Sequence, residues 1–256
     1  MLKKKINIKN KIQDLFLYFK IKKGDNLLIH SNIAGIFQFS QNKDELRKNL
    51  KLFFDSLLEF VGKKGTILFP AYNYDFAKGK VFDPYKSPSQ VGELANYLNF
   101  TYPGNRTNEP IFSHIVFGKL QKKVFGCDNT EAFGDKSVFN LILKKNFKII
   151  CFCCSPSSMT FIHFLEKKFK VKYRFNKYFN SSIIINNNKL SIRYKYYVGK
   201  KKINYSVKEE KIINLLDEKL TSKNLGKFNC YKISAKLLHD AIKKKLKKDN
   251  YYLIKK

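Results

Sequence analysis

The sequence lacks the short motifs that mark the commonest catalytic and cofactor chemistries. It contains no phosphate-binding loop, dinucleotide fingerprint, nucleophile elbow or metal-binding helix. Its four histidines do not stand at metal-ligand spacing from one another; they are His30, His114, His163 and His239. We therefore expect no metal ion, and the corresponding nucleotide and hydrolase families are excluded.

Tryptophan is absent, glycine is scarce and acidic residues are few. Lys and Arg number 51 against 20 Asp and Glu, which gives a formal net charge of +31. This charge favours anionic partners such as nucleic acid, a membrane surface or phosphate-bearing small molecules. AT-rich coding, which enriches Lys, Asn, Ile, Phe and Tyr together, explains the same composition without any binding role. The charge is therefore a weak guide to partners.

Long apolar runs and paired cysteines are also missing. No stretch approaches the ~18 apolar residues of a membrane span, and the basic N-terminus lacks the apolar core and cleavage site of a signal peptide. The cysteines number five, and three of them cluster at Cys151, Cys153 and Cys154. This pattern indicates reduced, buried thiols. We expect a cytoplasmic protein that forms a single domain over residues 1–256.

Apolar periodicity predicts strands and helices that alternate along much of the chain. Helices are expected at 12–19, 44–61, 87–98 and 137–144, and buried strands at 27–30, 66–69, 111–117 and 147–154. A β-hairpin with its turn at 186–188 and two terminal helices, 208–220 and 234–246, follow. The alternation predicts an α/β fold, with a mainly parallel central sheet flanked by helices, an added β-hairpin and C-terminal helices.

The most informative stretch is residues 155–166, which follows the last predicted strand of the sheet. Ser157 or Ser158 is expected to cap a helix that is apolar nearly all round. Thr160, His163 and Glu166 recur every third residue, so they lie on one side of this helix. A buried histidine satisfied by a nearby carboxylate explains the pattern as well as an active site does. The segment alone leaves both interpretations open.

Short stretches between residues 24 and 179 form a recognisable series. They include Ile29-His30-Ser31, Phe82-Asp83-Pro84, Ser87-Pro88-Ser89-Gln90-Val91-Gly92, Arg106, Ser113-His114, Phe133-Gly134, and Thr160 with His163 and Glu166. In this order the series resembles the aminoglycoside 3-N-acetyltransferase family, because a dozen short matches at family spacing rarely coincide by chance. The resemblance implies an α/β fold distinct from the common acetyltransferase superfamily, and acetyl-CoA as co-substrate.

The resemblance also assigns residues to a site. The catalytic residues would be Thr160, His163 and Glu166. Coenzyme-binding residues would be His30, Ser31, Asn32, Ser87, Ser89, Gln90, Val91, Arg106 and His114. Substrate-binding residues would be Tyr72, Tyr74, Asp75 and Asp83. The family usually carries a Gly-rich turn after its central strand, and this chain departs from that pattern at residues 153–156.

Acetyl transfer to an amine requires a base that removes a proton from the nitrogen. His163 suits this task, and Glu166 would orient its ring and stabilise the imidazolium. Thr160, or a backbone N–H near Ser31, would stabilise the oxyanion of the tetrahedral intermediate. We expect direct transfer, without a covalent acyl-enzyme.

The expected function is acetyl-CoA-dependent N-acetylation of a primary amine of an amino sugar. Because a polycation would be repelled by the net charge, a sugar nucleotide or surface-glycan precursor is the expected acceptor. A true aminoglycoside, acetylated to give antibiotic resistance, is the alternative. A nucleic-acid-binding protein and a catalytically idle relative are remoter alternatives; no nucleic-acid motif is present, and both His163 and Glu166 are retained. The sequence leaves open whether the chain forms a homodimer.

Overall fold

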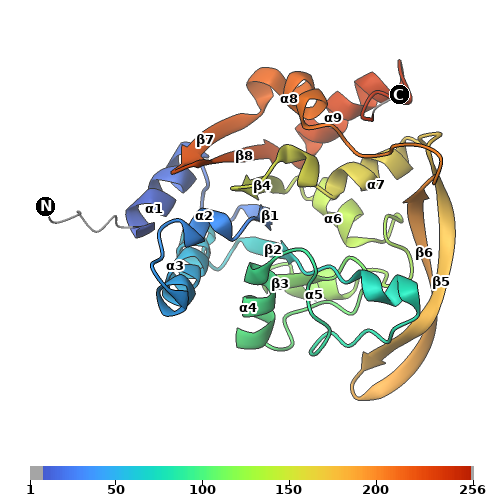
Figure 1. The fold of residues 1–256 in the computed structure, drawn as a ribbon, viewed down its shortest axis with the longest axis horizontal. Helices are drawn as coiled ribbons and strands as arrows, with labels where there is room; N and C mark the ends of the chain where they lie inside the picture. Colours follow the sequence, from blue (N-terminus) through green and yellow to red (C-terminus); the bar gives the residue numbers. More distant parts are fainter. Residues whose placement is uncertain (1–7, 255–256) are drawn as a thin grey trace, which may run out of the picture.

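The structure, a computed structural model, describes residues 8–254 and contains two β-sheets with helices around the larger one (Figure 1). The larger sheet has six strands in the order β3-β2-β1-β4-β8-β7. These strands are β1 (Asn26–Ser31), β2 (Thr66–Pro70), β3 (His114–Gly118), β4 (Lys148–Phe152), β7 (Thr221–Leu225) and β8 (Phe228–Ser234). The smaller sheet pairs β5 (Arg174–Ile185) with β6 (Asn188–Gly199).

Helices connect most of the strands. The α-helices are α1 (Ile8–Tyr18), α2 (Ala34–Phe37), α3 (Lys43–Val61), α4 (Glu93–Thr101), α5 (Gln121–Phe125), α6 (Val138–Lys144), α7 (Phe161–Lys168), α8 (Glu209–Leu216) and α9 (Ala235–Leu246). The 3-10 helices are η1 (Tyr74–Lys78), η2 (Pro156–Ser158) and η3 (Asp217–Lys219). None of the helices within residues 8–254 combines the length and apolar character that crossing a membrane requires.

Parallel pairing is confined to the centre of the six-stranded sheet. β1 pairs in parallel with β2 on one side and with β4 on the other. The pairs β2–β3, β4–β8 and β7–β8 are antiparallel. The predicted α/β fold with flanking helices and an added hairpin is therefore confirmed, but the prediction of a mainly parallel sheet is wrong, because the sheet is mixed.

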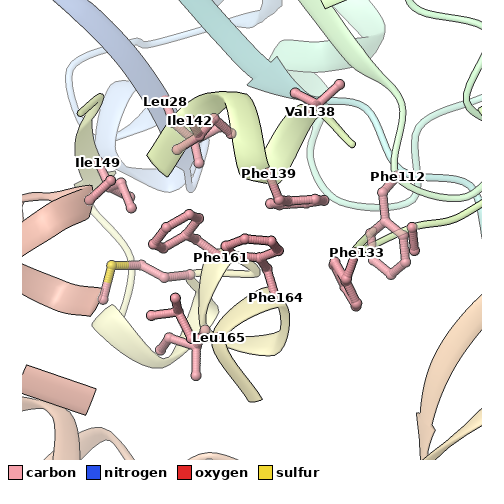
Figure 2. Packing of buried hydrophobic residues seen from close by; sticks show 14 of the residues in the cluster. Leu28, Phe112, Phe133, Val138, Phe139, Ile142, Ile149, Phe161, Phe164 and Leu165 are labelled. Carbon is pink, nitrogen blue, oxygen red and sulfur yellow. The ribbon is translucent and has the colours of Figure 1, made fainter. Parts of the chain in front are cut away.

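The side chains of β1 alternate between two hydrophobic cores, one on each face of the sheet. Leu27 and Ile29 lie in the core covered by α1, α3 and α4, whereas Leu28 lies in the core covered by α6, α7 and α9. Figure 2 shows the second core, where Phe139 of α6 stacks on Phe164 of α7 with ring centroids 6.5 Å apart. Complete burial of an aromatic side chain contributes roughly 1.5–3 kcal/mol, so both helices are held firmly against the sheet.

Local capping fixes α3 close to its predicted limits. Asn42 precedes the helix, and its side-chain oxygen accepts a hydrogen bond from the backbone N–H of Glu45 at 2.9 Å. Gly62 ends the helix with a φ of 59°, a left-handed conformation that favours glycine. The turn predicted at 186–188 is also confirmed, because Asn186 and Asn187 have φ values of 50° and 64°.

The helix predicted to begin at residue 87 begins later, at Glu93. Tertiary contacts use the polar groups that would have capped the earlier start. The N–H of Ser89 donates to Oδ1 of Asn96 at 2.7 Å, and Oε1 of Gln90 accepts from the N–H of Tyr74 at 2.9 Å. The segment 87–92 is therefore a loop, and the expected helix start for phosphate binding is not formed there.

Candidate active site

A cavity of about 300 Å³ lies at the carboxyl ends of the three parallel strands β1, β2 and β4. In open α/β sheets this edge is where ligands bind, because the strands end there and loops with polar side chains follow. The residues that line this central cavity are Ile29, His30, Ser31, Phe69, Pro70, Tyr72, Tyr74, Val91, Leu94, Ala95, Cys154, Ser157, Ser158, Thr160 and His163. The cavity thus collects side chains from β1 and β2, from α4 and α7, from the 3-10 helices η1 and η2, and from the segments between them.

The stretch after β4 carries the polar side of the cavity. Ser155 accepts a hydrogen bond from the N–H of Ser157 and caps η2. The predicted cap of the following helix by Ser157 or Ser158 is wrong, because both residues lie within η2 and Thr160 precedes α7 without a side-chain cap. α7 then begins at Phe161, with Thr160 as the residue before it. This arrangement places Thr160 and His163 on the cavity wall, whereas the next residue of the stripe, Glu166, is fully buried behind them.

His163 and Glu166 form a direct hydrogen bond, with 2.7 Å between Nδ1 of His163 and Oε2 of Glu166. The same carboxylate oxygen makes an ion pair with Nε of Arg174 at 2.6 Å. The hydroxyl of Tyr173 donates to the other carboxylate oxygen, Oε1, at 2.7 Å. Burial opposes ionisation of Glu166, but His163, Arg174 and Tyr173 together outweigh it and hold the pKa of the carboxyl below its usual value.

This geometry determines which nitrogen of His163 is free. When Nδ1–H donates to the Glu166 carboxylate, Nε2 carries the lone pair and can accept a proton. The imidazole lines the central cavity, and its side chain is 27% exposed. A neutral amine bound in the cavity could therefore lose a proton to His163, and Glu166 would stabilise the resulting imidazolium.

Two further polar side chains on the cavity wall are buried without a satisfied hydrogen bond. Nε2 of His30, a residue that is 7% exposed, has no partner among the described residues. The hydroxyl of Tyr72 approaches Thr160 but makes no hydrogen bond of good geometry there. Burial lowers the pKa of His30 to about 4, so the ring is neutral at physiological pH and can donate or accept one hydrogen bond. Unsatisfied polar groups of this kind indicate a missing polar ligand or water.

The structure does not bring every predicted coenzyme residue to the cavity. Arg106 is 2% exposed; its guanidinium contacts the Ser113 hydroxyl at 3.0 Å and donates to the carbonyls of Ser87 and Ala71. It therefore ties three loops together rather than facing the cavity. Asn32 also points elsewhere, because its side chain accepts from the N–H of Ala34.

His114 is fully buried in a second layer, edge-on to Tyr72 with ring centroids 5.5 Å apart. It has no direct place on the cavity wall. Three of the other predicted coenzyme-binding residues line the cavity, namely His30, Ser31 and Val91. The last three, Ser87, Ser89 and Gln90, lie in the loop before α4.

The two predicted substrate-binding acids also lie outside the central cavity. Asp75 and Asp83 line a separate depression of about 370 Å³, together with Lys80 and Lys86. Asp75 pairs with Lys80 at 2.9 Å and with Lys78 at 3.1 Å, and these bonds lower its pKa to about 2. Among residues 8–254, no acidic side chain lines the central cavity, whereas the predicted Tyr72 and Tyr74 do line it.

Sequence reasoning missed Tyr173, Arg174 and Cys154 as site residues. The segment that contains Tyr173 and Arg174 stands out in the sequence as basic and aromatic, but only the path of the chain into β5 turns both side chains toward Glu166. The sequence predicts that the cysteines around β4 are buried, and this is confirmed for Cys151 and Cys153. Cys154 itself is only half-buried and lines the cavity.

Comparison with known proteins agrees with this fold. The model of the family described as Aminoglycoside 3-N-acetyltransferase matches residues 28–247. The structure of the YokD protein from Bacillus subtilis is similar, with 17% sequence identity, a TM-score of 0.75 and coverage of 94% of each chain. No curated protein matches the sequence.

Solved structures with ligands in their descriptions share the fold as well. AAC-IIIb, described as a binary complex with CoASH, is 15% identical with a TM-score of 0.77, and the match covers 94% of this chain and 96% of that one. AAC-VIa bound to sisomicin is 17% identical with a TM-score of 0.74, and the match covers 95% and 97%. At such identities the likeness establishes the fold, while the family rests on the match over residues 28–247.

Proposed function

Because the chain belongs to the aminoglycoside 3-N-acetyltransferase family, a family of acetyl-CoA-dependent acyltransferases, we propose that it transfers an acetyl group from acetyl-CoA to a primary amine of an aminoglycoside-type acceptor. The observation that carries this proposal is the His163–Glu166 pair on the wall of the central cavity. It offers a base with a free Nε2 at the edge of the sheet where ligands bind.

The transfer proceeds in one ternary complex. The amine enters in its neutral form and attacks the thioester carbonyl carbon, while Nε2 of His163 removes the proton that the nitrogen must lose. Glu166, already ionised, stabilises the imidazolium at the moment it forms. The oxyanion of the tetrahedral intermediate takes a hydrogen bond from Thr160 or the Tyr72 hydroxyl, both of which line the cavity. Collapse of the intermediate expels the CoA thiolate, which recovers a proton from the imidazolium.

The thioester end of the coenzyme occupies the central cavity in this proposal. The AAC-IIIb structure described with CoASH supports CoA as the carrier for the family. In this chain His30 and Ser31 at the end of β1 are the polar groups available to it, and the unsatisfied Nε2 of His30 suits a carbonyl or amide of the pantetheine arm. Arg106 takes no part, because its donors are used within the protein.

The first experiment measures release of free CoA thiol from acetyl-CoA in the presence of sisomicin. We expect His163→Ala to lower turnover by ~10²–10⁴, the usual contribution of a general base, while acetyl-CoA binding changes by no more than a few-fold. His239→Ala is the matched control, because His239 pairs with Asp240 on α9, away from the cavity. Near wild-type turnover by His163→Ala would refute the assignment of the base.

There are two candidate classes of acceptor. The family match and the sisomicin-bound relative favour an aminoglycoside over the sugar nucleotide that the net charge suggests. One observation favours the second candidate, a neutral or anionic amino sugar: no acidic side chain among the described residues lines the central cavity. A polycationic drug would have to be held there by hydroxyl and carbonyl groups, without a counter-charge.

The salt dependence of KM separates the two candidates. If the net charge of +31 repels a polycationic acceptor, added salt screens the repulsion and the KM for sisomicin falls. For an amino sugar that carries a nucleotide diphosphate, the same salt screens an attraction and KM rises. Turnover of sisomicin with no turnover of sugar nucleotides would leave the aminoglycoside as the acceptor. The reverse result would establish the amino-sugar precursor.

A further inference from the structure

A nucleophilic thiol stands in the same cavity as the proposed base. Cys154 follows β4 and lines the central cavity together with Thr160 and His163. Its side chain is half-buried, and Oγ of Ser158 lies 3.5 Å from its sulfur. The cavity of about 300 Å³ holds roughly ten waters at ~30 Å³ each. A thioester that reaches His163 in so small a space therefore also comes close to Cys154.

The surroundings of Cys154 favour its reactive form. The neighbouring Cys151 thiol, and to a smaller extent Ser158, lower the pKa of the Cys154 thiol, although burial opposes this shift. The pKa of the buried Cys151 thiol itself is raised well above its usual value, so Cys151 stays protonated. The thiolate is the nucleophilic form of cysteine, so donors that stabilise it make Cys154 more reactive at neutral pH.

A second observation indicates that the cavity holds a polar ligand. Nε2 of His30, on a side chain that is 7% exposed, lines the cavity and has no partner among residues 8–254. An amide or carbonyl of the ligand in the cavity would satisfy it. Cys154 is therefore not an isolated thiol on a surface, since it shares a ligand-sized space with an unsatisfied donor or acceptor.

We propose that Cys154 is an acyl-accepting site, which takes the acetyl group of acetyl-CoA by thioester exchange when no amine is bound. The inference rests on the proposed function, because it needs the thioester in the central cavity. The Cys154 thiolate attacks the carbonyl carbon and a new S–C bond forms. The C–S bond to CoA breaks, and CoA leaves as a thiolate that takes up the proton lost by Cys154. One thioester replaces another, so the step needs no oxidant or reductant.

The exchange is tested on the full chain, incubated with acetyl-CoA without any amine and quenched in acid. Intact mass spectrometry should find one added acetyl group that hydroxylamine removes, which identifies a thioester rather than an acetylated lysine. Peptide mapping of the wild-type protein should place it on Cys154, whether or not any variant folds. Cys154→Ser should lose this label completely. Cys127→Ser should keep it, because Cys127 is half-buried but outside the cavity.

The same preparation is assayed for release of CoA with sisomicin, so that failure of either idea can be recognised. Amine-dependent release without a hydroxylamine-sensitive label would overturn the exchange and leave the proposed function intact. A label on Cys154 without transfer to any amine would support the exchange and overturn the proposed function. Equal labelling of Cys127 and Cys154 would show unspecific acetylation and overturn the exchange, and absence of both signals would overturn both ideas.

Discussion

Two buried histidines should make the folded protein sensitive to mild acid. His30 is 7% exposed and His114 is fully buried, and neither nitrogen of His114 has a hydrogen-bond partner in the described chain. Burial lowers the pKa of His30 to about 4 and that of His114 to about 3, from 6.5. Below pH 6.5 the unfolded chain binds two protons that the folded protein does not bind. Stability is therefore lost as the pH falls from 6.5 toward 4.

Glu109 should offset part of this loss. It is 4% exposed, and burial raises the pKa of its carboxyl well above 4.5, so the folded protein keeps this proton where the unfolded chain releases it. Its contribution to stability grows as the pH falls and is complete near pH 4.5. Each buried histidine alone lowers the stability by roughly 1 kcal/mol per pH unit once the pH is below 6.5. Glu109 reduces this slope, so the net loss is smaller than the two histidines alone would cause.

The substitution His114→Phe tests this reasoning. The new ring fits the position by shape, because His114 packs edge-on against Tyr72 and Phe139 with centroids 5.5 and 5.4 Å away. With one of the two buried histidines removed, the free energy of unfolding, measured in urea, should fall less steeply between pH 6.5 and 4.5 than in the wild type, by roughly 1 kcal/mol per pH unit. His239→Gln is the control and should keep the wild-type slope. A His114→Phe variant that loses stability as steeply as the wild type would refute the argument.

Three other substitutions test the contacts around the site. Glu166→Gln should lower turnover and move the pH–rate profile to lower pH, because the imidazolium of His163 loses its counter-charge; an unchanged profile would remove Glu166 from the mechanism. Tyr173→Phe takes a donor from the buried carboxylate, so urea unfolding should show a loss of about 1–3 kcal/mol. Arg106→Lys should cost a similar amount, because an ammonium cannot reach all three acceptors of the guanidinium. Its dissociation constant for acetyl-CoA should stay near the wild-type value, and strong weakening would restore the coenzyme role that the sequence suggests.

The parts of the fold that could be predicted are those whose signal is local. α3 has an apolar stripe over five turns, a capping Asn42 and a terminal Gly62, and its predicted and observed limits differ by one residue. β7 was missed because it is mainly polar, and β8 because its apolar residues do not alternate regularly with its polar ones. Both strands lie toward one edge of the sheet. The pairing of β8 with β4, and of β7 with β8, is a long-range contact that no local pattern encodes. This omission and the antiparallel pairing of β3 with β2 are why the sheet was expected to be mainly parallel.

For the candidate site too, local contacts could be predicted from the sequence and long-range contacts could not. The i, i+3 spacing of His163 and Glu166 was enough to predict their contact, because helix geometry brings such residues together. The helix start predicted near Ser87 is wrong because the Ser87 hydroxyl accepts a hydrogen bond from the N–H of Asp83. The donors of Arg106 are also used within the protein, so its predicted place beside the coenzyme is not seen in the geometry of the cavity. Arg174 could not be predicted, since its approach to Glu166 depends on how β5 leaves the end of α7.

Arg174 also explains how a fully buried carboxylate can assist a base. A buried, unpaired anion is costly. If His163 were the sole partner of Glu166, the carboxylate would therefore stay ionised only while the imidazole carried a positive charge. Arg174, at 2.6 Å from the same carboxylate oxygen, supplies a permanent positive charge, and the Tyr173 hydroxyl supplies a donor to the other oxygen. In the proposed mechanism, Glu166 can therefore remain an anion while His163 is neutral and ready to accept a proton. The guanidinium of Arg174 also lies 3.1 Å from Nδ1 of His163, so Arg174 contacts both members of the pair.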